Sequence, residues 1–468
     1  MSYLGPKGYS IYKNSITVNE QQFIRKELSV KPYIPQSTIQ PPSFEIFRES
    51  NQKIYIPRFF GNSLYGTPEE NRISDSIPIN CPFEGELRDY QNKIVNTYYK
   101  TAHEKGGGLI EIGCGRGKTV MALKIISMMK VKTIVIVHKS FLLNQWLERI
   151  EQFLPNAKVG RIQGQTLDIE DKDIVIGMLQ SLSMKSYPPE LFGKFGLTIV
   201  DEVHHIAAEV FVRSLFKIVT PYVLGLSATM DRKDGLTKVF KMFLGEIMYK
   251  EENKEDHNVI VKAIDYKVED EDFNEIVYDY RGNPLYSTMI SKLCNYSHRS
   301  EFILKILENL YKENNEQQIM ILGHNKCLLV YLFKAIEERN FASVGYYVGG
   351  MKEIELKKSE SKNIIIATYS MASEALDIKT LTTLIMATPK TDVTQSIGRI
   401  LRTKHGNPLV IDIIDTHEIF RNQWKKRLTY YRKQKYTVYL NNELTNDPSK
   451  IVTKKQTKKC MVNMKGLV

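Results

Sequence analysis

The chain has 468 residues, of which 42% are hydrophobic and 25% charged, as in an average soluble globular protein. No apolar run approaches the ~20 residues that a membrane span needs, and the first residues lack the apolar core of a signal peptide. The five cysteines are scattered and odd in number, which argues against a disulfide framework and a zinc site. We therefore expect an intracellular, soluble and monomeric protein.

The net charge of +12 is concentrated at the C-terminal end. Residues 421–468 contain 13 lysines and arginines against two acidic residues, whereas the rest of the chain is close to neutral. A basic segment on a neutral body is typical of a contact with a polyanion. A solvated helix face followed by a frayed terminus is the alternative interpretation.

Residues 1–80 have the densest use of proline and contain short β-prone pieces such as 53–57. We expect a small accessory module that contains strands and wraps on the body of the protein. Its sequence carries no recognisable chemistry.

Residues 81–252 alternate short β-branched runs with helical stretches. Continuous apolar strands that alternate with helices are typical of a parallel sheet covered on both faces. The predicted strands are 109–112, 133–137, 174–176, 197–200 and 223–226, and the predicted helices include 119–129 and 140–153.

Residues 253–440 repeat this pattern, so we predict an α/β fold of two tandem parallel-sheet lobes. Trp424, Tyr430 and Tyr431 have helical spacing on the last predicted helix, and we expect them to pack against the second lobe. Residues 441–468 form a basic tail that we expect to be disordered. The strands predicted in the second lobe are 319–322, 343–347, 364–368, 384–386, 409–413 and 436–440, and its helices include 298–312, 326–339 and 415–434.

A glycine-rich turn joins the first predicted strand of the first lobe to the helix that follows it. Ile112 stands where the strict phosphate-loop pattern has its first glycine, but the Gly-x-Gly-Lys-Thr core is present. Glycines let backbone N–H groups turn toward phosphate oxygens, while Lys118 would reach the β- and γ-phosphates and Thr119 would coordinate Mg²⁺. The residues expected to bind ATP here are Gly113, Cys114, Gly115, Arg116, Gly117, Lys118 and Thr119.

Two carboxylates, Asp201 and Glu202, follow the apolar strand 197–200. A carboxylate at the C-terminal end of a parallel strand, facing the phosphate loop, is where a Mg²⁺ ligand belongs. We expect Asp201 to hold the metal and Glu202 to orient and deprotonate the attacking water. His204 and His205 suggest a metal site, but a coupling role suits their position better. Their expected partners in this relay are Ser227 and Thr229.

Arg399 and Arg402 lie three residues apart on a predicted helix and therefore share one face. Gln395 and Gly398 complete the pattern Gln-x-x-Gly-Arg-x-x-Arg. Phosphoryl transfer needs positive charge where negative charge develops, and an arginine delivered across an interface supplies it. We expect both arginines to act in catalysis and Gln395 to take part in coupling.

With these motifs together, the chain resembles superfamily 2 helicases across residues 85–440. The resemblance implies two RecA-like lobes, with ATP bound by the first and contacted by the second. It also implies that Gln91 reads the adenine base with support from Arg88, and that Asp377 contacts the nucleotide. Ala375 departs from the family, which usually has glycine there.

The same resemblance implies a set of nucleic-acid contacts. One motif comprises residues 138–140 with Gln145 and Trp146, a second begins at Gln180, and a third includes Thr368, which would touch a phosphate. The residues implied to bind nucleic acid are His138, Lys139, Gln180 and Thr368.

Residues 113–115 and 224–235 are most similar to XPB-type DNA helicases and their relatives in large cytoplasmic DNA viruses, including the poxviral transcript-release helicase. The DEVH sequence at 201–204 departs from the DEAD form of RNA-unwinding proteins. The resemblance implies an ATP- and Mg²⁺-dependent helicase that acts on DNA rather than RNA in viral transcription. It implies RNA polymerase or transcription-complex proteins as partners, a cytoplasmic virus factory as location, and packaging in the virion.

Three other functions remain open at this point. These alternatives are an RNA helicase, a translocase that remodels protein–nucleic-acid complexes without unwinding, and a catalytically inactive nucleic-acid-binding scaffold. The presence of the catalytic set argues against the scaffold. That set is Lys118, Asp201, Glu202, Arg399 and Arg402.

Overall fold

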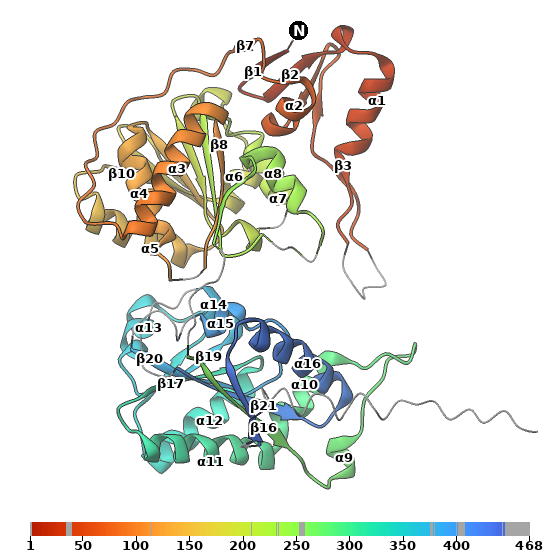
Figure 1. Ribbon diagram of the computed structural model, residues 1–468, viewed down its shortest axis with the longest axis vertical. Coiled ribbons are helices and arrows are strands. Elements are labelled where there is room, and N and C mark those ends of the chain that lie inside the picture. The colour runs from red at the N-terminus through yellow and green to blue at the C-terminus, as the bar shows by residue number, and fades with distance from the viewer. Residues whose placement is uncertain are drawn as a thin grey trace, which may run out of the picture. The chain divides into compact units, whose positions relative to one another are not determined.

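The computed structural model describes residues 2–33, 40–113, 115–206, 208–230, 232, 234–251, 258–374, 378, 380–398, 400, 408–441 and 443–444. The chain divides into two compact units, which we call unit 1 (Met1–Glu252) and unit 2 (Asn253–Val468). Figure 1 shows the elements of each unit. Among the helices described, none combines the length and apolar character that crossing a lipid bilayer requires.

The sheet of unit 1 has eight strands in the order β11-β10-β12-β9-β13-β14-β8-β15. Neighbouring strands are parallel except for β11, which pairs antiparallel with β10. The predicted parallel α/β fold is therefore confirmed, and β9 and β13 have the predicted bounds. The strands are β8 Gly107–Glu111, β9 Thr133–Val137, β10 Val159–Gln163, β11 Thr166–Asp168, β12 Ile174–Met178, β13 Leu197–Val200, β14 Tyr222–Ser227 and β15 Ile247–Lys250.

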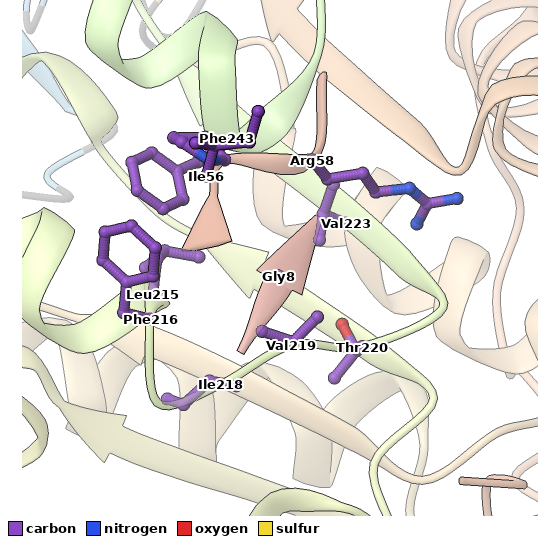
Figure 2. A pocket seen from close by; sticks show the side chains of 11 residues that line it. Gly8, Ile56, Arg58, Leu215, Phe216, Ile218, Val219, Thr220, Val223 and Phe243 are labelled. Atoms are coloured by element: carbon purple, nitrogen blue, oxygen red, sulfur yellow. The ribbon is translucent and has the colours of Figure 1, made fainter. Parts of the chain in front are cut away.

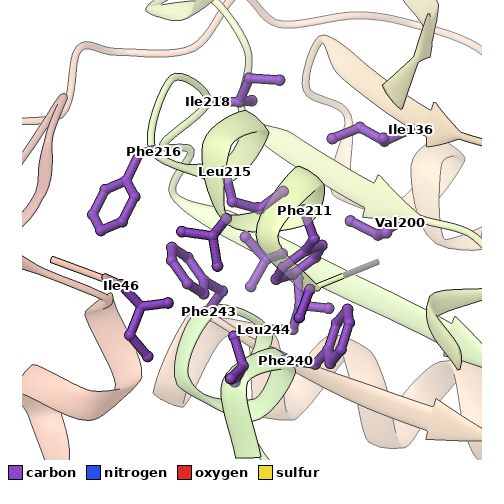
Figure 3. Close-up of a cluster of buried hydrophobic side chains, with 14 of the residues drawn as sticks. Ile46, Ile136, Val200, Phe211, Leu215, Phe216, Ile218, Phe240, Phe243 and Leu244 are labelled. Carbon is purple, nitrogen blue, oxygen red and sulfur yellow. The ribbon is translucent and has the colours of Figure 1, made fainter. Parts of the chain in front are cut away.

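Both faces of this sheet are buried, because successive side chains of a strand point to opposite faces. In β9, Ile134 and Ile136 belong to one core, while Val135 and Val137 belong to the other. The second core is covered by α3 (Asp89–Lys105), α4 (Lys118–Met129) and α5 (Ser140–Phe153). The first is covered by α6 (Leu179–Met184), α7 (Ala208–Leu215) and α8 (Thr237–Leu244), whose phenylalanines Figure 3 shows packed together.

The N-terminal residues form a five-stranded sheet of order β5-β6-β2-β1-β7 that joins the first core of unit 1. Tyr9, Ile54 and Ile56 are fully buried, and Ile46 reaches the phenylalanine cluster of α7 and α8 (Figure 3). The module therefore packs as part of unit 1. Its elements are β1 Ser2–Gly5, β2 Gly8–Tyr12, α1 Val18–Glu27, β3 Ser29–Val30, β4 Phe44–Glu45, β5 Arg48–Glu49, β6 Lys53–Ile56, α2 Arg58–Tyr65 and β7 Glu70–Asn71.

A cavity of about 30 Å³ lies where this module meets α7 and α8 (Figure 2). Its walls are mainly apolar and include Leu215, Phe216 and Phe243. Arg58 at its rim donates to the carbonyl of Pro221 at 2.6 Å. With room for about one water molecule and no carboxylate in its lining, this cavity is a packing gap and no candidate for phosphate chemistry.

Unit 2 repeats the design with the order β18-β19-β17-β20-β21-β16-β22-β23, parallel throughout except for the pair β22–β23. Trp424 and Tyr431 lie in its core, which confirms that they pack against the second lobe. The strands are β16 Ile260–Tyr266, β17 Gln318–Gly323, β18 Val344–Tyr347, β19 Ile364–Thr368, β20 Leu381–Met386, β21 Leu409–Asp415, β22 Thr437–Leu440 and β23 Glu443–Leu444. The helices are α9 Glu271–Asn274, α10 Tyr286–Asn295, α11 Ser297–Glu313, α12 Lys326–Arg339, α13 Glu353–Glu360, α14 Tyr369–Glu374, α15 Thr394–Ile397 and α16 Glu418–Lys433.

Two predicted boundaries at the C-terminal end of unit 2 are wrong. The last helix was expected to begin at Asp415, but Asp415 ends β21, because its buried carboxylate accepts two hydrogen bonds from Arg299 at 2.6 and 2.9 Å. The tail was expected to begin at residue 441, but Glu443 and Leu444 pair with β22 and extend the sheet. Residues 445–468 lie outside the described part of the chain.

A second buried ion pair ties α16 to the sheet. Arg427 donates to both carboxylate oxygens of Asp412 on β21, each at 2.8 Å, and Tyr431 donates to one of them at 2.8 Å. Asp412 and Arg427 are each 1% exposed. Because neither charge is accessible to water, each depends on the other for solvation.

We expect Asp412→Asn to lower the free energy of unfolding by about 3–5 kcal/mol, because it leaves the Arg427 guanidinium buried without a counter-charge. The measurement is urea unfolding followed by circular dichroism. The control is Glu308→Gln, which removes the exposed pair with Arg339 (2.8 Å) and should cost about 1 kcal/mol or less. Equal losses in the two variants would contradict the assigned role of burial.

Candidate nucleotide-binding site

Three predicted motifs of unit 1 meet at one edge of its sheet. The adjacent strands β13, β14 and β8 are parallel, so their carboxyl ends lie side by side. β8 leads into the phosphate loop (residues 112–117), β13 leads into Asp201 and Glu202, and β14 ends at Ser227. The carboxyl edge of a parallel sheet is where such folds bind ligands.

The phosphate loop turns sharply because two of its glycines adopt left-handed backbone angles. Gly115 has φ of 76° and Gly117 has φ of 82°. A Cβ atom at residue 117 would lie 2.4 Å from the side-chain nitrogen of Gln91, so only glycine fits there. Helix α4 starts at Lys118 directly after the turn, which directs its first N–H groups toward an incoming anion.

Helix α3 holds this loop from behind. Tyr90 Oη and Gln91 Nε2 both donate to the carbonyl of Arg116, at 2.9 and 3.0 Å, and Gln91 Oε1 accepts from the N–H of Arg88 at 2.9 Å. The buried amide of Gln91 therefore anchors the phosphate loop, whereas Arg88 is exposed. Recognition of adenine by Arg88 and Gln91 stays a prediction.

Asp201 is a buried carboxylate, 4% exposed, at the end of β13. One of its oxygens accepts from the indole Nε1 of Trp146 at 2.8 Å, and the other accepts from the N–H of Glu202 at 2.9 Å. Burial, with the adjacent charge of Glu202, raises the pKa of Asp201 to about 6. Such a carboxylate is stabilised by a cation. Mg²⁺ prefers oxygen ligands, so Asp201 and the Thr119 hydroxyl fit this ion by type.

Glu202 lies between the phosphate-loop lysine and the first histidine of the DEVH sequence. Its backbone is left-handed, with φ of 49°. Its carboxylate is 3.4 Å from Lys118 Nζ and 3.4 Å from His204 Nδ1. The segments that follow β8 and β13 therefore bring Lys118 and Glu202 within ion-pair distance.

Three of the residues expected to couple the motifs, His204, Ser227 and Thr229, are in contact. Ser227 Oγ is 2.9 Å from His204 Nδ1 and donates to the carbonyl of Thr229 at 2.5 Å. Arg232, to which sequence reasoning assigned no role, donates to the carbonyls of His204 and Ile206 at 2.8 and 2.9 Å. The guanidinium thus fixes the loop that follows the carboxylates.

The residues expected to bind nucleic acid follow other strands. His138 and Lys139 follow β9, and the exposed Gln180 follows β12, so all three lie at the same sheet edge as Asp201. Burial lowers the pKa of Lys139. Thr368 ends β19 in unit 2.

Trp146 belongs to the same motif as His138 and Lys139, but its side chain lies inside unit 1. Its ring is fully buried in α5 and its only polar atom is directed at Asp201, so it offers nothing to a polymer. The Gln145–Trp146 pattern indicated that the tryptophan has a specific role, but only the fold shows that it donates to Asp201.

Four predicted site residues lie outside the described part of the chain: Cys114, Asp377, Arg399 and Arg402. For Gln395, only its backbone place in α15 is described.

We expect Lys118→Ala and Glu202→Gln both to abolish ATP turnover, for different reasons. The first removes the positive charge needed at the phosphates, so it should also weaken nucleotide binding. The second keeps ATP bound but leaves the water without its base. Steady-state hydrolysis and binding of a fluorescent nucleotide separate these effects. Glu209→Gln, on the exposed pair with Arg213, is the control. Robust turnover by Glu202→Gln would remove that residue from the catalytic role.

Trp146→Phe keeps an aromatic ring but removes the N–H that holds Asp201. Loss of a residue that orients a metal ligand costs typically 10–100-fold in metal affinity or activity. We therefore expect the Mg²⁺ concentration for half-maximal hydrolysis to rise at least about tenfold. Trp424→Phe, the same change in unit 2, should leave it unaltered. A lower melting temperature with an unchanged Mg²⁺ requirement would show that Trp146 only fills space.

Comparison with known proteins agrees with this geometry. The family described as "Type III restriction enzyme, res subunit" matches residues 84–232. "Putative ATP-dependent RNA helicase L396" of Acanthamoeba polyphaga mimivirus is 35% identical over 98% of this chain and 91% of its own. "DNA 3'-5' translocase XPB2" of Sulfurisphaera tokodaii is 36% identical over 40% of each chain.

Among solved structures, "S. cerevisiae Dbp5 bound to RNA and ADP BeF3" has a similar fold. The TM-score is 0.54 at 14% identity, with 79% of this chain and 93% of that chain covered. The chain belongs to the superfamily 2 helicases, in the XPB-like branch that includes helicases of large DNA viruses, and it is an ATP-dependent helicase that binds nucleic acid.

Proposed function

We propose that this helicase is a Mg²⁺- and ATP-driven DNA motor that works in viral transcription. The observation that carries the catalytic part is the approach of Lys118 Nζ to Glu202 at 3.4 Å, beside the buried Asp201. This arrangement puts a phosphate-binding cation, a metal ligand and a base within one site. Phosphoryl transfer to water requires these three functions together.

In this proposal, the phosphate loop binds the triphosphate through its N–H groups and Lys118. Asp201 and Thr119 hold Mg²⁺, which when bound neutralises charge on the β- and γ-phosphate oxygens. Glu202 orients a water molecule and accepts its proton. Unit 2 supplies Arg399 and Arg402, whose charge stabilises the transition state, while Asp377 contacts the nucleotide.

Nucleotide state reaches the polymer through the contacts that follow β13 and β14. His204 contacts both Glu202, at 3.4 Å, and Ser227, at 2.9 Å. A movement of the Glu202 carboxylate is therefore transmitted to the end of β14. The polymer is bound in unit 1 at the carboxyl edge of the sheet, by His138, Lys139 and Gln180. Thr368 grips it in unit 2, and Gln395 belongs to the coupling set. Binding and hydrolysis of ATP then close and open the lobes and step the polymer.

The choice of DNA rests on two observations. The DEVH sequence differs from the DEAD form of RNA-unwinding proteins, and the XPB2 relative, which is 36% identical over 40% of this chain, is named a DNA translocase. The mimivirus relative supports a viral setting. We propose RNA polymerase or transcription-complex proteins as partners, a monomeric state, a virus factory in the cytoplasm as the place of action, and packaging in the virion.

The second candidate is an RNA helicase. It is favoured by the mimivirus relative, which is named an RNA helicase and matches nearly the whole chain. A motor that remodels protein–nucleic-acid complexes without separating strands is a variant of the first proposal, since it shares the same ATP site.

We expect duplex or single-stranded DNA to stimulate ATP hydrolysis more strongly than RNA of the same length and sequence. The measurement is steady-state hydrolysis without polymer and with each polymer, with Glu202→Gln as the blank. Stimulation by RNA alone would replace the DNA motor with the RNA helicase. Displacement of streptavidin from biotinylated DNA without strand separation would identify the remodelling motor.

A further inference from the structure

A carboxylate from the far end of unit 1 lies at the mouth of the phosphate loop. Glu251 Oε2 accepts a hydrogen bond from the N–H of Gly113 at 3.0 Å, and Glu251 Oε1 is 2.7 Å from Nε and 2.6 Å from a terminal nitrogen of Arg116. The side chain of Glu251 is only 14% exposed. These contacts span 135 to 138 residues of sequence, so the position of Glu251 is set by the fold.

The sheet brings Glu251 to this place. β15 pairs in parallel with β8 up to Lys250 and Glu111, and the N–H of Glu251 donates to the carbonyl of Glu111 at 2.9 Å. Lys250 also pairs with the Glu111 carboxylate at 3.0 Å. The backbone of Glu251 is thereby fixed beside the strand that leads into the phosphate loop, and unit 1 ends at the next residue.

The donors that Glu251 uses are those that a phosphate group uses. A backbone N–H of a glycine-rich loop and a guanidinium are both typical ligands of phosphate oxygens. The guanidinium of Arg116 also lies over the ring of Tyr90, 4.9 Å from its centroid. A carboxylate held by such donors is the anion that an approaching triphosphate meets first, and like charges repel.

We propose that Glu251 belongs to the nucleotide site: it occupies the mouth of the phosphate loop and is displaced from Gly113 and Arg116 by nucleotide phosphates. This inference rests on the nucleotide site proposed above. Glu251 thus lowers nucleotide affinity and holds the loop in its binding shape until phosphate arrives. Displacement frees Arg116 to contact the nucleotide.

The test compares the dissociation constant of MgADP, measured by calorimetry, for the full-length chain and for Glu251→Gln. The glutamine has the same shape but no charge to hold Arg116, so MgADP should bind at least about tenfold more tightly, the equivalent of one hydrogen bond to a charged group. Glu251→Asp, which keeps the charge on a side chain one carbon shorter, should also bind more tightly. Structural damage would weaken binding and would not produce this gain.

Glu246→Gln is the matched control, because Glu246 precedes the same strand and its carboxylate pairs with Lys241 (2.7 Å), away from the phosphate loop. In an Arg116→Ala background, Glu251→Gln should lose most of its effect, since the partner it competes for is gone. Unchanged or weaker binding by Glu251→Gln would overturn the proposal. A parent protein that binds no MgADP would instead overturn the nucleotide site itself, and Glu251 with it.

Discussion

Two adjacent carboxylates, Asp201 and Glu202, are shielded from water, and their negative charge must be stabilised by neighbouring groups of unit 1. Burial and repulsion by Glu202 raise the pKa of Asp201 to about 6, because the groups around it do not fully stabilise its ionised form. Lys118, at the start of α4, lies 3.4 Å from Glu202 and offsets part of that charge. The indole of Trp146 stabilises Asp201 as a neutral hydrogen-bond donor. It thereby connects Asp201 to α5, the helix that follows His138 and Lys139. One helix thus joins the proposed metal ligand to the residues proposed to bind the polymer.

Local sequence was sufficient for the parts of the fold that are buried on both sides. β9 and β13 are uninterrupted β-branched and apolar runs, and they have the bounds expected of them. β16 was missed because Lys262 and Asp265 interrupt its apolar residues, although it lies inside the sheet of unit 2. Asp415 was read as the start of a helix because nothing near it in sequence reveals that Arg299 neutralises it across the core.

The candidate site divides in the same way. The phosphate loop and the DEVH residues carry their chemistry in short strings, because glycine turns and strand ends are local features, so they could be found without coordinates. Glu251 and Arg232 act through partners that the chain brings from elsewhere, and no short pattern encodes such pairs. Trp146 was noticed as part of a motif, but its hydrogen bond to Asp201 was not foreseen, since burial of an aromatic residue is decided by packing and not by its own segment.

The chain has two tryptophans, and the fold places one in each unit. Trp146 donates to a carboxylate of the nucleotide site, whereas Trp424 lies in the core of unit 2, 5.8 Å from the guanidinium of Arg427. Indole emission responds to nearby charge, so each unit carries its own intrinsic fluorophore. With one tryptophan replaced by phenylalanine, the emission of the other follows events in a single unit, in solution and without a chemical label.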